Sequence, residues 1–279
     1  MSERASASSD LATRVVTALV LGALVIAVLA SASTSLWALV VLAFALLASW
    51  EAARLVAREG SWRVFAATAV VVLAAAGLAL SWPETGATRA IKLWISLALF
   101  YWLFFAPAAL RRARIETRWP HGALTVALVL GSAVLAAILL HRIGVIWLVA
   151  VLLIAIVADV AGYFIGRGWG RVALAPQISP KKTIEGAAGG VVAAALWSAL
   201  AADQLELVRA GWQLLVAGAV GAALGALSVL GDLWESQLKR QAGVKDASGL
   251  LPGHGGVLDR IDAQLPVLPA AAGLVIALG

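Results

Sequence analysis

The sequence predicts an all-α, polytopic integral membrane protein built as a helical bundle, and three observations lead to this prediction. Of the 279 residues, 62% are hydrophobic and 13% are charged, and the mean hydropathy is +0.96. Soluble domains are about half apolar and about a quarter charged, so this chain has too little polar surface to cover a soluble globule. The apolar residues form long runs with few charges and no strict alternation. Such runs exclude a membrane β-barrel and leave helices as the way to satisfy the backbone in lipid.

The apolar runs predict about nine transmembrane helices, because a helix needs about 17 to 25 apolar residues to cross a bilayer. The candidate spans are 15–32, 35–50, 64–82, 90–106, 122–140, 143–162, 186–202, 211–230 and 264–279, of which the second and the last are short. We therefore divide the chain into three parts. These are a polar, disordered tail at 1–14, five N-terminal spans at 15–140, and a region of four spans at 141–279 that would contain the chemistry.

The distribution of arginine and lysine predicts the orientation of the spans. With a cytoplasmic N-terminus, most of these cations fall in cytoplasmic segments, and the outside segments contain Arg89, Lys92, Arg142 and Arg209. The positive-inside rule therefore favours an N-terminus in the cytoplasm and a C-terminus outside. Two long polar loops, 163–185 and 231–263, then lie on the cytoplasmic side and can meet there. The net charge of +6 is thus explained by membrane topology rather than by nucleic-acid binding.

The second polar loop combines cations, carboxylates and glycines in a way that suits a polyanion and its metal. Asp232 and Glu235 lie where the eighth span ends, and Asp259 and Asp262 repeat the same spacing beyond a glycine-rich stretch. A single acid pair is more often a helix cap or a salt bridge, but two pairs around one loop favour a metal. Carboxylate oxygens are the ligands that Mg²⁺ prefers, and nucleotide phosphates usually complete its shell. His254 in this loop either orients a phosphate or is a turn residue.

The first polar loop follows an ionisable residue at membrane depth. Asp159 lies near the cytoplasmic end of the sixth span, where a charge is costly and is usually paired or functional. Tyr163 is one helical turn further on. The glycines at 166–170 are expected to expose backbone N–H groups, and the segment 179–183 places two lysines before the seventh span. A phosphate there would meet ammonium groups, hydroxyls and a helix N-terminus, although an ordinary positive-inside loop explains the same residues.

Two composite motifs carry a resemblance. The first is Ser236-x-Leu238-Lys239-Arg240-x4-Lys245-Asp246 followed by Pro252-x-His254-Gly255-Gly256-x-x-Asp259-Arg260-x-Asp262, and the second is Asp159-x-x-x-Tyr163-x-x-Gly166-Arg167-x-x-Gly170 followed by Ser179-Pro180-Lys181-Lys182-Thr183-x-Glu185-Gly186. Together they resemble the phosphatidate cytidylyltransferases, the CDP-diacylglycerol synthases. The motifs cover the C-terminal half, whereas the N-terminal half is similar in hydropathy only. Gly162 and Ala173 depart from the family pattern, which has alanine and often lysine there.

This resemblance implies the transfer of CMP from CTP to the phosphate of phosphatidic acid, giving CDP-diacylglycerol and pyrophosphate, with Mg²⁺ as the cofactor. The lipid phosphate is itself the nucleophile in an in-line attack on the α-phosphorus, so positioning and charge neutralisation suffice for catalysis. That agrees with a chain that contains no cysteine. The resemblance also implies the bilayer as a partner, no nucleic acid, and a homodimer. Together with the Ala- and Arg-rich composition, it implies a bacterial plasma (inner) membrane, with the active site facing the cytoplasm.

The roles of individual residues follow from this resemblance. Asp232 and Asp259 are expected to bind the metal and, with Lys239 and Arg260, to form the catalytic group. The expected substrate-binding residues are Lys181, Lys182, Ser179, Ser236, Arg240, Lys245, His254, Gly255, Gly256, Asp159 and Tyr163. The expected supporting residues, which would hold those side chains in place, are Asp246, Asp262 and Glu235.

Three other functions compete with this interpretation. A transporter or channel would use Asp159 and Asp232 to line a cation path, but transport sites lie near the midplane and these residues lie toward one face. A CTP-dependent lipid-alcohol kinase would release CDP instead of pyrophosphate. An enzyme that consumes CDP-diacylglycerol would need an acidic array beginning Asp-Gly-x-x-Ala-Arg, which this sequence lacks.

Overall fold

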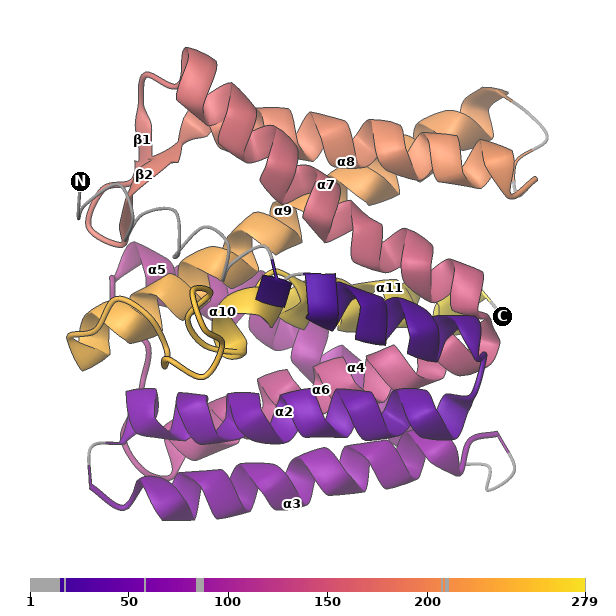
Figure 1. Ribbon diagram of the computed structural model, residues 1–279. Coiled ribbons are helices and arrows are strands. Elements are labelled where there is room, and N and C mark those ends of the chain that lie inside the picture. Colours follow the sequence, from indigo (N-terminus) through magenta and orange to yellow (C-terminus); the bar gives the residue numbers. More distant parts are fainter. Residues whose placement is uncertain are drawn as a thin grey trace.

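Long helices running side by side make up most of the protein (Figure 1). The computed structural model describes residues 16–278 except 18, 58, 84–87, 207, 209 and 210, so the predicted tail at 1–14 lies outside the described residues. The helices are α2 (Thr34–Val56), α3 (Ser61–Leu80), α4 (Thr88–Phe100), the π-helical turn η1 (Tyr101–Phe105), α5 (Ala106–Arg111), α6 (His121–Ile143), α7 (Val145–Trp169), α8 (Ile184–Gln204), α9 (Gly211–Ala242), α10 (Leu258–Ile261) and α11 (Gln264–Leu278). Strands β1 (Ala173–Ala175) and β2 (Ser179–Thr183) form a small antiparallel hairpin between α7 and α8.

The structure confirms the predicted fold class of an all-α polytopic membrane protein. In the described part of the chain, seven helices are long and apolar enough to cross a membrane. The predicted second span was expected to be short, and that was wrong, because α2 has 23 residues. The first and last predicted spans correspond to the shorter apolar helices Leu19–Ala30 and Gln264–Ala277. The total of nine spans and the cytoplasmic N-terminus therefore stay predictions.

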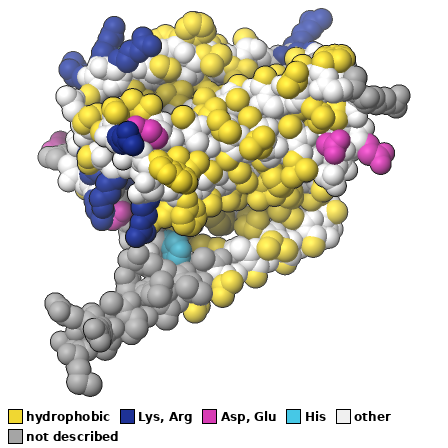
Figure 2. Space-filling view, turned by 90° about the horizontal axis from the view of Figure 1, so that it is seen from above, with side chains coloured by type: hydrophobic (Ala, Val, Ile, Leu, Met, Phe, Trp, Pro, Cys, Tyr) yellow, Lys and Arg dark blue, Asp and Glu magenta, His cyan; other side chains and the backbone are white. Residues whose placement is uncertain are grey.

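The surface carries the apolar side chains that a membrane helix presents to lipid. Leu215 and Val70 are examples of large hydrophobic residues that are mostly exposed. Seen from above, the molecule shows hydrophobic side chains across its middle and charged side chains toward its two ends (Figure 2). The interior helix is α6, which is buried over most of its length and packs against α2, α3, α4, α7 and α11.

Glycines bring α7, α8 and α9 into close contact, as the small residues of the seventh and eighth spans predict. A Cβ atom on Gly190 of α8 would lie 2.6 Å from the Ala158 carbonyl oxygen of α7. A Cβ atom on Gly221 of α9 would lie 2.5 Å from the Ala194 carbonyl oxygen of α8. Neither approach leaves room for a larger residue. These contacts fix α7 and α9, which carry the two motifs, on either side of α8.

Both polar loops are shorter than predicted because the helices before them continue past their apolar runs. Helix α7 extends to Trp169 and α9 extends to Ala242, so the connections that remain are 170–183 and 243–257. The glycines at 166–170 do not form an exposed phosphate nest, since Gly166 and Gly168 are helical and the Gly170 N–H donates to the Gly166 carbonyl. The two connections lie at the same end of the bundle, at the left in Figure 1.

Candidate active site

A polar cavity of about 660 Å³ lies where the two motif regions meet. Its walls come from the last turns of α7, the β1–β2 hairpin, the start of α8, the second half of α9, and α10 with the loop before it. The predicted site residues that line it are Asp159, Tyr163, Lys181, Lys182, Asp232, Lys239, Asp246, Asp259, Arg260 and Asp262. The structure thus brings together side chains that are up to about a hundred residues apart, as the meeting of the two loops predicts.

The β-hairpin reaches the cavity through an ion pair between Lys182 and Asp232. The Ser236 hydroxyl, one turn along α9, donates to the other Asp232 oxygen at 3.3 Å. Thr183 then begins α8, because its hydroxyl accepts a hydrogen bond from the Gly186 N–H at 3.1 Å. Such an N-terminal cap satisfies one of the free N–H groups of the helix and fixes where the hairpin ends. This fixed end keeps Lys182 facing α9.

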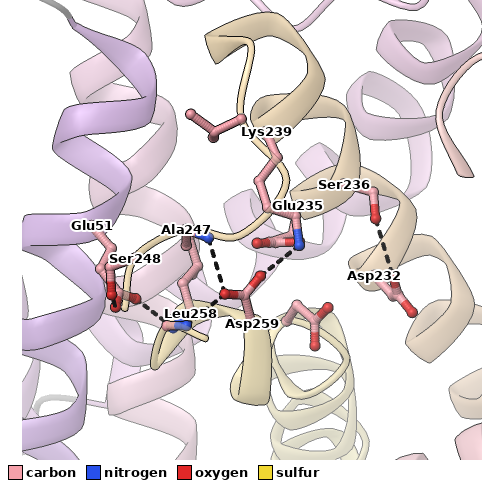
Figure 3. Close-up of polar contacts among 12 residues, drawn as sticks. Glu51, Asp232, Glu235, Ser236, Lys239, Ala247, Ser248, Leu258 and Asp259 are labelled. Carbon is pink, nitrogen blue, oxygen red and sulfur yellow. Dashed lines mark hydrogen bonds and ion pairs between the residues drawn. The ribbon is translucent and has the colours of Figure 1, made fainter. Parts of the chain in front are cut away.

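Lys239, which lines the cavity, joins the carboxylates of Asp259 and Glu235 (Figure 3). Its Nζ lies 2.5 Å from Oδ1 of Asp259 and 2.6 Å from Oε2 of Glu235, one turn back on α9. The Glu235 side chain has no exposed surface and the Asp259 side chain is 4% exposed. Glu235 therefore contacts Lys239 from the interior and does not itself line the cavity, and its supporting role stays a prediction.

Asp259 is also the residue on which the loop before α10 closes. Its Oδ2 accepts hydrogen bonds from the Gly256 N–H at 2.7 Å and from the Ala247 N–H at 3.0 Å. Burial alone would raise the pKa of Asp259, but the hydrogen bonds from Lys239 and from these two backbone groups outweigh it and hold the pKa below its usual value. Asp259 is thus an anion held in a fixed orientation at the edge of the cavity.

Asp262 lies at the end of α10 and lines the same cavity. Burial, together with the nearby negative charge of Asp232, raises the pKa of Asp262 well above its ordinary value. Asp159 reaches the cavity from α7 on the opposite side. Carboxylates that crowd together in this way repel one another, and a bound cation would relieve the repulsion.

A second polar cavity of about 650 Å³ adjoins the first and shares Asp246 and Arg260 with it. It is lined by the glycine-rich loop, including the predicted residues Lys245, His254 and Gly255. The alternative prediction, that His254 is a turn residue, also finds support. The backbone N–H of His254 donates to the Leu251 carbonyl, and Gly255 next to it has a φ of 86°. That left-handed conformation favours glycine.

Besides Glu235, four predicted residues line neither cavity. Ser236 is buried against Asp232, and Ser179 begins β2. The Arg240 guanidinium donates to the Ile178 carbonyl at 3.1 Å, so it ties the hairpin turn to α9. Gly256 is part of the loop before α10, and a Cβ atom on it would come 2.6 Å from Oε1 of Glu51.

The N-terminal half contributes polar contacts that sequence reasoning missed. Glu51 of α2 is fully buried and accepts hydrogen bonds from the loop before α10. Gln241 of α9 exchanges two hydrogen bonds with the Ile115 backbone, and Gln237 donates to the Ala113 carbonyl at 2.5 Å. A signal for Glu51 existed, because it directly follows the predicted span 35–50, and an acid near membrane depth is costly and marks a paired or functional group.

The donor set of the main cavity fits Mg²⁺. Within the described residues, no three of His, Cys, Asp and Glu are close enough to form a preformed metal site. Mg²⁺ does not need one, since it is usually held by one or two carboxylates and completed by substrate phosphates and water. Asp232 and Asp259 line one cavity with Asp159 and Asp262, and all four supply the carboxylate oxygens that this ion prefers.

Fold and site together define a helical membrane protein with a cation-lined and carboxylate-lined cavity at one end of its bundle. A model of the cytidylyltransferase family matches residues 12–278. The chain therefore belongs to the cytidylyltransferase family.

Curated relatives agree with this assignment. Proteins named phosphatidate cytidylyltransferase from Pseudomonas aeruginosa, Brucella suis and Mycobacterium bovis are 41%, 47% and 42% identical over 133, 121 and 129 residues. These stretches are 47%, 43% and 45% of this chain. They cover 48%, 42% and 40% of the relatives, so the chain matches less than half the length of each.

Proposed function

We propose that this protein is a phosphatidate cytidylyltransferase, which transfers CMP from CTP to phosphatidic acid and releases pyrophosphate. The observation that carries the proposal is the convergence of both motifs on one cavity, in which Lys182 pairs with Asp232 and which Asp259 and Arg260 also line. Relatives that bear this name and the family match support the same activity. One substrate is a lipid and the other a polyanion, which suits a charged cavity at the end of a membrane bundle.

The side chains in the cavity would position two anions for an in-line reaction. Lys181, Lys182, Lys239 and Arg260 neutralise the CTP phosphates and the lipid phosphate, whose oxygen attacks the α-phosphorus while pyrophosphate leaves. A bond forms between the lipid phosphate oxygen and the α-phosphorus, and the bond from the α-phosphorus to the β-bridging oxygen breaks. No protein nucleophile takes part. Holding the reacting atoms in line supplies much of the rate enhancement.

Asp232 and Asp259 are the residues that would hold Mg²⁺. The ion, when bound, supplies positive charge to the phosphates at the reacting centre. Asp259 is already fixed by three hydrogen bonds, so it can present a carboxylate without reorganising. Asp246 and Asp262 keep the neighbouring cations oriented.

The location and assembly belong to the same proposal. The cavity would face the cytoplasm, where CTP is found, in a bacterial plasma membrane that supplies phosphatidic acid. The positive-inside pattern of the sequence supports this orientation. The homodimer implied by the resemblance also stays a proposal.

Pyrophosphate release tests the proposal. Purified protein in detergent is given CTP, Mg²⁺ and phosphatidic acid, and wild type is compared with Asp259→Asn and with Asp203→Asn, which changes an exposed acid near the end of α8. We expect lipid-dependent release that falls at least a hundredfold in Asp259→Asn and is unchanged in Asp203→Asn. Release of CDP instead of pyrophosphate would replace the proposal by a lipid kinase. No release with any lipid phosphate would reject both.

A further inference from the structure

We propose that Glu51, a residue of the N-terminal half, is a positioning residue that holds α10 and its Asp259 and Arg260 in place at the cavity. Three observations carry this inference. They are the hydrogen bonds of the Glu51 carboxylate, the alternation of its donors with those of Asp259 along the loop, and the lack of space for a side chain at Gly256. The part that concerns turnover rests on the proposed transferase function, whereas the part that concerns the loop does not.

The Glu51 carboxylate accepts three hydrogen bonds from the loop that leads into α10 (Figure 3). The donors are the Ser248 hydroxyl at 2.5 Å, the Val257 N–H at 2.9 Å and the Leu258 N–H at 2.6 Å. Glu51 lies on α2, about two hundred residues earlier in the sequence, and has no exposed surface. A buried carboxylate with three donors around it is held in a single orientation.

Helix α10 depends on this carboxylate because it lacks a cap of its own. The first N–H groups of a helix have no partner within it. Val257 stands at the N-cap position and makes no side-chain cap hydrogen bond. Glu51 therefore supplies, from another helix, the cap that the local sequence does not provide.

The contacts of Glu51 and Asp259 alternate along the loop. Ala247 donates to Asp259 and the next residue, Ser248, donates to Glu51. At the other end of the loop, Gly256 donates to Asp259 and Val257 donates to Glu51. The loop is thus closed at both ends onto the same two carboxylates. Movement of one carboxylate would shift the donors of the other.

The space around Gly256 supports the same conclusion. A Cβ atom there would lie 2.6 Å from Oε1 of Glu51, so a larger residue would push the loop off the carboxylate. The close approach of Glu51 thus explains why the chain has glycine at this position of its first motif.

Hydrogen–deuterium exchange of the full-length protein in detergent tests the structural part. The variants are Glu51→Gln, which keeps the shape but replaces one acceptor by a donor, and Ser248→Ala, which removes one of the three hydrogen bonds. Ser49→Ala is the matched control, since Ser49 is also buried in α2 but bonds only to the Ala45 carbonyl of its own helix. We expect exchange in peptides spanning 247–262 to rise at least tenfold in Glu51→Gln, less in Ser248→Ala, and not in Ser49→Ala.

Turnover per folded molecule tests the positioning role. We expect kcat to fall at least tenfold in Glu51→Gln, with less than a threefold further loss when Glu51→Gln is added to Asp259→Asn, because both changes act on one loop. Unchanged exchange at 247–262 in Glu51→Gln overturns the inference whatever the activity. Raised exchange with an unchanged kcat overturns the positioning role and leaves a structural cap. If Glu51→Gln does not fold, Ser248→Ala decides by the same criteria.

An inactive wild type would reject the proposed function and not this inference. The exchange measurement does not depend on the reaction, so it still decides whether Glu51 holds the loop.

Discussion

Lys239 and Asp259 form an ion pair of 2.5 Å that joins α9 to α10 across 20 residues of sequence. The same ammonium group lies 2.6 Å from the buried carboxylate of Glu235. One cation thus compensates two carboxylates that have almost no contact with solvent. This arrangement fixes the distance between the helix that carries Asp232 and the helix that carries Arg260.

Replacing the cation in this group is expected to destabilise the protein. Lys239→Met leaves the buried Glu235 carboxylate without its ion-pair partner and leaves Asp259 with its two backbone donors alone. Breaking a buried pair in this way costs about 3–5 kcal/mol. We expect a clear fall in Tm in detergent and loss of turnover. Lys245→Met is the control, because Lys245 is exposed in the adjoining loop. Equal Tm values for the two variants would contradict the role assigned to Lys239.

The Lys182–Asp232 ion pair predicts an effect on substrate affinity. The two side chains are 27% and 25% exposed, so the loss of Lys182 leaves Asp232 partly hydrated and the fold intact. A hydrogen bond to a charged group contributes about 1.5–3 kcal/mol. We therefore expect Lys182→Gln to raise the KM for CTP by about tenfold to a hundredfold.

Arg240→Gln is the matched comparison for that measurement. Its guanidinium contacts the Ile178 carbonyl and lines neither cavity, so we expect the KM for CTP to change by less than threefold. A rise as large as that of Lys182→Gln would place Arg240 at the substrate, as the sequence predicts, and contradict the geometry.

Metal removal is expected to stop turnover reversibly. Excess chelator should abolish pyrophosphate release, and added Mg²⁺ should restore it. Asp232→Asn removes one of the two expected ligands, so the Mg²⁺ concentration for half-maximal activity should rise at least tenfold. Titration of Mg²⁺ at saturating CTP measures this. Full activity in chelator would contradict a metal-dependent reaction. An unshifted titration would contradict the assignment of Asp232 as a metal ligand.

The glycine contact between α7 and α8 predicts a stability difference. Gly190→Ala would place a Cβ atom 2.6 Å from the Ala158 carbonyl, and overpacking of this kind costs about 1–3 kcal/mol. Gly168→Ala is the control, because a Cβ atom there would meet nothing within 4 Å. We expect thermal unfolding in detergent to show a lower Tm for Gly190→Ala alone. A Tm of Gly190→Ala equal to wild type would mean that the helices can separate at no cost.

The sequence predicted the positions of the helices well and their ends less well. Hydropathy identifies a span because lipid selects apolar side chains, but it does not register a helix that continues into water or along a polar cavity. That is why α9 runs on to Ala242, through Asp232 and Lys239, beyond the predicted end at 230. It is also why Tyr163 is helical rather than part of a loop.

The motifs predicted which residues lie at the site, but they did not predict which of these line the cavity and which are buried behind it. Asp232 and Glu235 lie three residues apart and were predicted as one acid pair, yet Asp232 lines the cavity and Glu235 lies buried behind Lys239. The contribution of Glu51 depends on α2 packing near α10, which no local pattern records. Long-range contacts of this kind become visible only in the folded chain.

The most direct test of the account is the fate of the phosphates of CTP. Purified protein in detergent is incubated with Mg²⁺, phosphatidic acid and CTP labelled either at the α-phosphorus or at the γ-phosphorus, and the lipid is then extracted. The account predicts that the α-label enters the lipid fraction and the γ-label leaves as soluble pyrophosphate. Entry of the γ-label into the lipid, or of neither label, would contradict it.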